Sequence, residues 1–124
     1  MRVIRASEGA SEERTSAAIF SGGQVWSRAL GGPATGAGKD MNISVVQFGA
    51  GARARMHRHT GDQLLYVVGG IGKVGTASEE HVVSTGDFIL IPGGEDHWHG
   101  AGDTGSPMSH ITVTPAGSET SVTG

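Results

Sequence analysis

The frequent glycines of this chain break it into short segments and so limit the folds that it can adopt. Glycine supplies 22 of the 124 residues and separates short runs that are rich in Val, Ile and Phe. Short β-favouring runs with turn residues about every 8 to 12 positions are typical of all-β domains. No long apolar stripe with a helical period is present, so few helices are expected. The sequence therefore predicts an all-β fold.

The strand candidates fall into a strong and a weak group. About eight to ten short strands in a chain of this length must close into a barrel or a two-sheet sandwich, because closure removes exposed sheet edges. Residues 11–18 are predicted to form one helical turn with Ser11 as its cap. The strong strand candidates are residues 42–48, 63–70, 72–77, 80–84, 87–92 and 108–115, and the weaker ones are residues 17–23 and 24–30.

The chain has the length of a single domain with one modest core. Residues 1–40 are expected to form an N-terminal arm that ends in a Gly-rich loop, and residues 41–115 to form the main β-barrel. Residues 116–124 have the composition of a frayed, flexible tail.

Charge and composition limit the kinds of molecule that this protein is expected to bind. The formal net charge of −3 gives no electrostatic footprint for nucleic acid. The chain has no cysteine, so disulfides and thiolate metal sites are excluded. It also lacks an apolar signal-peptide core and any run of 18 apolar residues, so we expect no membrane span and a cytoplasmic location.

Two histidines in the stretch "MHRHTGDQLLYVVGG" carry the first chemical signal. His57 and His59 are two residues apart, and side chains on a strand alternate faces, so both rings lie on one face. Gln63 lies four positions after His59 and opens an apolar run. A pair of imidazoles on one face, with a polar side chain across a tight turn, is an arrangement that can bind a metal ion.

Two segments together resemble the cupin superfamily over roughly residues 41–114. The first, "GARARMHRHTGDQLLYVVGG", contains Gly51, His57, His59, Gln63 and Gly70 in the order of the first cupin motif, and the second, "GDFILIPGGEDHWHG", matches the other motif. The resemblance implies a double-stranded β-helix, or jelly roll, with one metal ion at its mouth. Two positions depart from the pattern, since Gln63 stands in place of a glutamate and Ala101 in place of an asparagine. The second motif is carried by Gly86, Pro92, Gly94 and His97.

The resemblance implies a ligand set of His57, His59, Gln63 and His97 for one divalent transition metal ion. Manganese is preferred, followed by iron, with zinc and nickel as further candidates, because imidazole-rich sites suit all of them. A glutamine leaves the ion its full charge, which favours polarisation or stabilisation of an anion. The alternatives are a polar histidine cluster without metal, or a degenerate site that binds metal weakly.

Two further histidines are the predicted catalytic residues. His99 follows His97 by two positions, so "HWH" repeats the same-face parity. His110 alternates with Thr112 along "MSHITVT", and if that face looks inward the imidazole can take or return a proton. The alternative for His110 is a hydrogen-bonded structural histidine. Candidates for apolar lining are Val46 or Phe48, Leu65, Val67, Phe88, Leu90 and Trp98.

Within the cupins, the chain is most similar to small bacterial members that include manganese-dependent hydroxynitrile lyases. The similarity implies a lyase-type reaction on a small molecule, with His110 as the base and a homo-oligomer, either a dimer or a tetramer. Two other classes stay open. One is a quercetinase-like dioxygenase that uses iron or manganese, and the other is a cupin that binds a small molecule without catalysis.

Overall fold

A computed structural model describes residues 1–124, and it confirms the all-β prediction. Its only helix is a short 3-10 turn, η1, and no helix has the length and apolar character needed to cross a membrane. The elements are β1 (Glu12–Glu13), β2 (Phe20–Ser21), β3 (Val25–Gly31), η1 (Pro33–Thr35), β4 (Met41–Phe48), β5 (Arg53–Ala54), β6 (His57–His59), β7 (Gln63–Gly75), β8 (Glu80–Ser84), β9 (Phe88–Ile91), β10 (Trp98–Gly100), β11 (Met108–Pro115) and β12 (Thr120–Val122).

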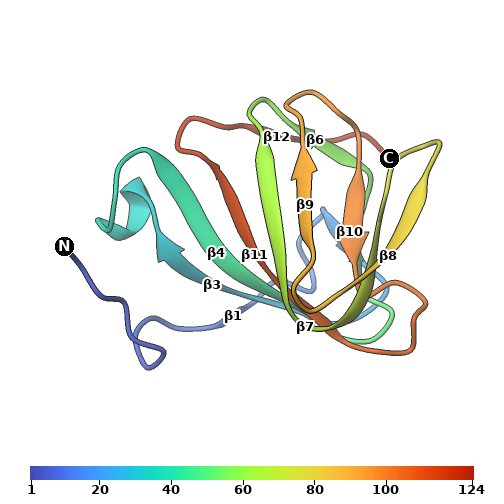
Figure 1. The fold of residues 1–124 in the computed structure, drawn as a ribbon, viewed down its shortest axis with the longest axis horizontal. Coiled ribbons are helices and arrows are strands. Elements are labelled where there is room, and N and C mark those ends of the chain that lie inside the picture. The colour runs from blue at the N-terminus through green and yellow to red at the C-terminus, as the bar shows by residue number, and fades with distance from the viewer.

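Strand β7 links the two halves of the jelly roll. Its first part pairs with β11 and β9, and its second part pairs with β10 and β8. The main sheet has the order β1-β3-β4-β11-β7-β10-β5-β2, and it curls around a common interior (Figure 1). The interior of this curl is where inward-facing side chains from both halves meet.

A glycine bend makes this continuity of β7 possible. Two separate strands over residues 63–70 and 72–77 were predicted, whereas one strand runs from Gln63 to Gly75. Gly70 has φ +75, and a Cβ at this position would overlap the carbonyl oxygen of Pro107. Because only glycine takes that backbone shape without strain and leaves that space, the chain turns here without leaving the sheet.

The N-terminal arm pairs with the sheet of its own chain. Strand β3 lies antiparallel to β4, and β1 joins β3 through Glu12 opposite Ser27 and Glu13 opposite Trp26. The predicted helical turn over residues 11–18 is therefore wrong, because pairing with a distant strand outweighs the local cap signal of Ser11. The weak strand over residues 17–23 shrinks to β2, which pairs with β5.

The C-terminal segment contains a strand where its composition predicted a frayed end. Strand β12 pairs with β6, with Thr120 opposite His59 and Val122 opposite His57 (Figure 1). Small polar residues lower the strand signal of such a segment. They do not prevent backbone pairing with a strand that offers a free edge.

Apolar side chains from both halves of the jelly roll fill one core. The expected interior residues Phe48, Leu65 and Val67 are buried. Phe88 and Leu90, which were also expected to line the interior, are 65% and 79% exposed. Ile89 and Ile91, which alternate with them on β9, are the less exposed pair, so the face of this strand that packs on the core is opposite to the predicted one. The core cluster consists of Val25, Val46, Phe48, Ala52, Leu65, Val67, Val74, Val83, Ile91, Ala101 and Met108.

Candidate metal centre

The buried polar side chains of this protein form a single set of six. The core is otherwise apolar, and burying an imidazole or an amide is costly unless it finds partners. The structure brings together all the residues that the sequence analysis selected as ligands or catalytic groups. They are His57, His59, Gln63, His97, His99 and His110.

Strand β6 presents two of these histidines, and a backbone bridge places the third beside them. His57 and His59 are buried while Arg58 between them is exposed, as alternation along a strand requires. The backbone N–H of His57 donates to the carbonyl of His97 at 2.9 Å, and the reverse bond measures 2.8 Å. The ring centroids of His57 and His97 are consequently 4.3 Å apart.

One ring nitrogen of each of His57, His59 and His97 lies within 4.8 Å of the other two. The Nδ1 atom of His57 donates to the carbonyl of Arg55 at 2.6 Å, and that of His97 donates to the carbonyl of Glu95 at 2.8 Å. A carbonyl oxygen only accepts, so Nδ1 carries the proton in both rings and Nε2 keeps a lone pair. These Nε2 lone pairs are the atoms that a metal ion requires.

The side-chain oxygen of Gln63 lies close to the Nε2 atom of His97. The side-chain N–H of Gln63 donates to Thr112 Oγ1 at 2.8 Å, and its Oε1 lies 3.0 Å from Nε2 of His97. Burial lowers the pKa of His97, so the ring is neutral near pH 7 and its Nε2 presents a lone pair to Oε1. In this orientation of the amide a cation between the two acceptors satisfies both, whereas the turned-over amide would donate an N–H to Nε2 of His97 and accept from the Thr112 hydroxyl.

The separation of these two acceptors also fits a shared ion. Ligands about 2.1 Å from one ion, at a right angle to each other, are about 3.0 Å apart. In addition, Nε2 of His59 is buried without a hydrogen-bond partner. The residues present therefore fit a divalent metal ion held by three imidazoles and one amide oxygen.

Burial keeps the donor rings neutral. It lowers the pKa of His57 to about 4, and it also lowers the pKa of His59. Charge repulsion from His97 contributes to both of these shifts. Because the donor set contains no carboxylate, a bound divalent ion would keep its full formal charge.

His99 and His110 form a second buried unit next to the donor set. Nε2 of His110 lies 2.9 Å from Nδ1 of His99, so the two rings share one proton in a hydrogen bond. Burial places the pKa of His99 well below its usual range and lowers that of His110 to about 4. Nδ1 of His110 is buried and has no partner. The ring of His99 is stacked on that of His97 at 5.9 Å, so it lies between the donor set and His110.

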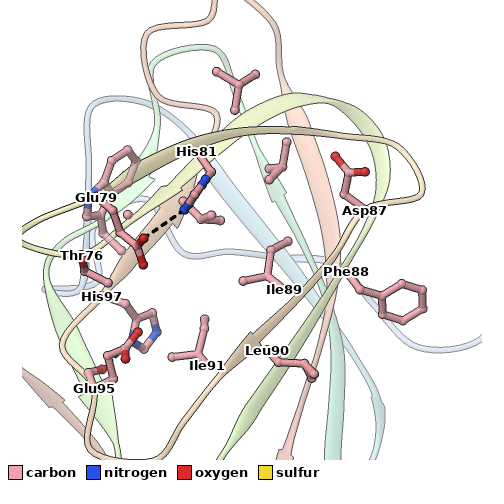
Figure 2. A pocket seen from close by; sticks show the side chains of 15 residues that line it. Thr76, Glu79, His81, Asp87, Phe88, Ile89, Leu90, Ile91, Glu95 and His97 are labelled. Atoms are coloured by element: carbon pink, nitrogen blue, oxygen red, sulfur yellow. Dashed lines mark hydrogen bonds and ion pairs between the residues drawn. The ribbon is translucent and has the colours of Figure 1, made fainter.

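A cavity of about 470 Å³ opens beside His97. Figure 2 shows His97 near Ile91 and Glu95, with Ile89 farther along the wall and Phe88 pointing away. Its volume lies within the usual range for sites that bind small molecules, and His97 is the only one of the six buried polar residues that lines it. Carboxylates stand among its lining residues, and one of them, Glu79, pairs with the exposed His81 at 3.3 Å. The polar lining residues are Thr76, Glu79, His81, Asp87, Glu95 and His97.

Two threonines that contact the donor set were not predicted to do so. Thr112 was placed on the same face as His110, and the structure adds its hydrogen bond to Gln63. Thr120 lies 2.8 Å from Nδ1 of His59, through its Oγ1 atom. Only the alternation around His110 gave a signal for Thr112. The polar composition around Thr120 gave none.

Comparison with known proteins identifies the family. Residues 44–114 match the cupin domain. This match covers more than half of the chain, and the protein therefore belongs to the cupin family, which confirms the resemblance found in the sequence.

Two curated relatives are lyases by name. The chain is 39% identical over 71 residues to an (R)-mandelonitrile lyase from Granulicella tundricola, covering 55% of this chain and 52% of that protein. It is 32% identical over 83 residues to a dimethylsulfoniopropionate lyase from Ruegeria pomeroyi, covering 67% of this chain and 55% of that protein. The chain thus spans about half the length of the curated relatives it matches.

The solved structures agree on the fold. A cupin-like protein from Thermotoga maritima superposes with a TM-score of 0.79 at 25% identity, and the match covers 100% of this chain and 90% of that one.

Proposed function

We propose that this protein is a metal-dependent enzyme that acts on a small organic molecule by a lyase-type acid–base reaction. The observation that carries the proposal is the buried donor set, in which one ring nitrogen of each of His57, His59 and His97 lies within 4.8 Å of the other two and Nε2 of His59 is buried without a partner. Similarity to two proteins named as lyases supports the reaction class. His57, His59, Gln63 and His97 would hold the metal, with manganese preferred over iron, and zinc or nickel after these.

The metal would supply a positive charge that polarises a bound hydroxyl, carbonyl or cyano group. The chain's own contribution is proton handling by His110 and His99. When Nε2–H of His110 donates to Nδ1 of His99, Nδ1 of His110 keeps a lone pair that has no other partner. We assign the role of base to His110, and His99 keeps that ring oriented.

The cavity beside His97 supports a compact substrate with an apolar body. Val74, Val83 and Ile89 contribute to its apolar wall, and Trp98 adds a large ring. His97 is the one donor that lines this cavity, so a substrate held there would meet the metal from the His97 side. A small hydroxy or carbonyl compound, such as a cyanohydrin, fits this description.

The test is a cyanohydrin cleavage assay with manganese-loaded and iron-loaded protein, run with and without O2. Release of hydrogen cyanide that is independent of O2, and that falls in His110→Phe, is the expected result. Turnover of a test substrate such as a flavonol with consumption of O2 would favour a dioxygenase instead. Binding of small carbonyl compounds without turnover would favour a non-enzymatic cupin.

We also propose that the protein is a homo-oligomer. Val68, Phe88 and Leu90 expose apolar side chains on β7 and β9, and the ring of Phe88 lies 4.4 Å from that of Tyr66. A symmetric pair would place this same surface on both copies and remove it from water. Sedimentation of Leu90→Asp tests this, because an interface here predicts a shift to monomer, and unchanged mass would contradict it.

A further inference from the structure

We propose that Thr120, on the C-terminal strand β12, is a positioning residue that holds His59 as a metal ligand. This inference rests on the proposed metal centre. If the inference holds, strand β12 supports the metal centre through Thr120, although Thr120 contributes no ligand atom of its own.

The three histidines of the donor set are held in two different ways. His57 and His97 each donate Nδ1–H to a carbonyl two residues earlier in their own segment, at 2.6 and 2.8 Å. The equivalent carbonyl for His59 is that of His57, and it already accepts the backbone N–H of His97 at 2.8 Å. The Nδ1 atom of His59 is instead paired with an atom from elsewhere in the chain.

That atom is the Thr120 hydroxyl oxygen, which lies 2.8 Å from Nδ1 of His59. The two residues are 61 positions apart in sequence and directly opposite each other in the β12–β6 pair. Accepting a hydrogen bond from Nδ1–H leaves Nε2 of His59 with its lone pair. That Nε2 is buried without a partner, so the hydroxyl holds the ring in the orientation that a metal ion would use.

Hydrogen bonds between backbone groups, and from backbone N–H groups to the hydroxyls of Thr60 and Ser118, hold Thr120 in register on both sides. A strand with exposed side chains gains little from burial, so its position depends on hydrogen bonds. Four of these bonds join the segment to the region around β6: Thr60 N–H to Glu119 O at 2.9 Å, Glu119 N–H to Thr60 Oγ1 at 2.9 Å, Gly61 N–H to Ser118 Oγ at 3.2 Å, and Thr123 N–H to Met56 O at 2.9 Å.

The exchange Thr120→Val removes the hydroxyl while keeping a β-branched side chain of similar size. Losing a hydrogen-bond partner behind a ligating histidine typically weakens metal binding about 10- to 100-fold. We therefore expect Mn²⁺ affinity to fall by about that factor in Thr120→Val. In Thr120→Ser the hydroxyl is retained, so affinity should stay within about threefold of the wild type.

The experiment measures Mn²⁺ affinity by titration of the full-length wild type, Thr120→Val, Thr120→Ser and Ser121→Ala. Ser121 is the matched control, since it lies on the same strand opposite the exposed Arg58. Thermal unfolding of the metal-free variants checks that β12 remains folded. Equal affinity of wild type and Thr120→Val would overturn the inference, and so would failure of Thr120→Ser to restore binding.

A second readout separates this inference from the proposed metal centre. Nitrogen-15 NMR of the metal-free protein reports the hydrogen bonding of each imidazole ring. Thr120→Val should shift the ring signals of His59 and leave those of His57 unchanged. If the wild type binds no Mn²⁺, the metal proposal fails, and the NMR result still decides whether Thr120 orients His59.

Discussion

Two tripeptides of the same form, "HRH" at residues 57–59 and "HWH" at residues 97–99, end in different arrangements. In the first, both rings enter the donor set and the central Arg58 is exposed. In the second, His97 joins that set, whereas His99 shares a proton with His110. The central Trp98 of the second pair is itself buried.

The hydrogen bond at Nδ1 accounts for this difference. Rings whose Nδ1 is bonded to a carbonyl or a hydroxyl direct Nε2 at a common point, as His57, His59 and His97 do. The Nδ1 of His99 is bonded to His110 instead. Spacing therefore places two rings on one face, while the partner of the other nitrogen decides whether a ring is a ligand.

We expect the largest effect in a comparison of metal affinity between alanine variants of the two histidines of "HWH". His97→Ala should lose metal affinity by more than the roughly 100-fold that removal of an outer hydrogen-bond partner costs, because a ligand itself is missing. His99→Ala should retain metal within about tenfold. Titration with Mn²⁺ measures both variants, and equal loss in the two would contradict the division of roles.

The next effect concerns the proton that His99 and His110 share. His110→Phe should lower turnover by about 10²- to 10⁴-fold, the usual contribution of a general base, while metal content stays unchanged. Phenylalanine suits this buried position, which already packs against Phe48 at 5.4 Å. Steady-state kinetics and elemental analysis of the same sample check it, and full turnover in this variant would remove His110 from the chemistry.

A third prediction concerns stability of the metal-free protein in acid. The folded-state pKa of His57 and of His110 is lowered to about 4, below the ordinary 6.5. The unfolded chain therefore binds more protons between these values, so stability is complete above pH 6.5 and is lost as pH falls towards 4. Each histidine contributes a slope of about 1.4 kcal/mol per pH unit in this window.

Urea unfolding at several pH values between 4 and 6.5 measures how the free energy of unfolding changes with pH. His110→Phe should reduce this slope by about 1.4 kcal/mol per pH unit, since one titrating group is removed. A slope identical to that of the wild type would show that His110 does not titrate from a buried, neutral state.

The smallest effect should come from Gln63→Glu. A carboxylate reduces the charge of the bound ion, so metal affinity should rise, and stabilisation of an anionic group should weaken. We expect about a tenfold loss of cyanohydrin cleavage, which corresponds to about 1.4 kcal/mol. Higher lyase activity in this variant would contradict the charge argument for Gln63.

Much of the fold followed from alternation and spacing, whereas the set of candidate ligands came from the resemblance to cupins. Period-two parity placed His57 and His59 on one face and left open which way His110 points, and all three are buried. The same rule misplaced Phe88 and Leu90, because both residues of each neighbouring pair on β9 are apolar and either face looks suitable for a core.

What could not be predicted depends on contacts between distant segments. The pairing of β12 with β6 needs a free strand edge that exists only after the barrel forms. The bend at Gly70 is fixed by the approach of Pro107, 37 positions later in the chain. The role proposed for Thr120 follows from the pairing of β12 with β6 and could not be predicted from the residues next to it in the sequence.

The most direct test of the central claim is the metal content of the protein purified without chelator, with His57→Ala prepared in parallel. We expect close to one equivalent of manganese, or another divalent transition metal, in the wild type and little in the variant. Absence of metal from both, even after incubation with Mn²⁺, Fe²⁺, Zn²⁺ and Ni²⁺, would contradict it. The contact between His97 and Gln63 would then be a hydrogen bond from the turned-over amide.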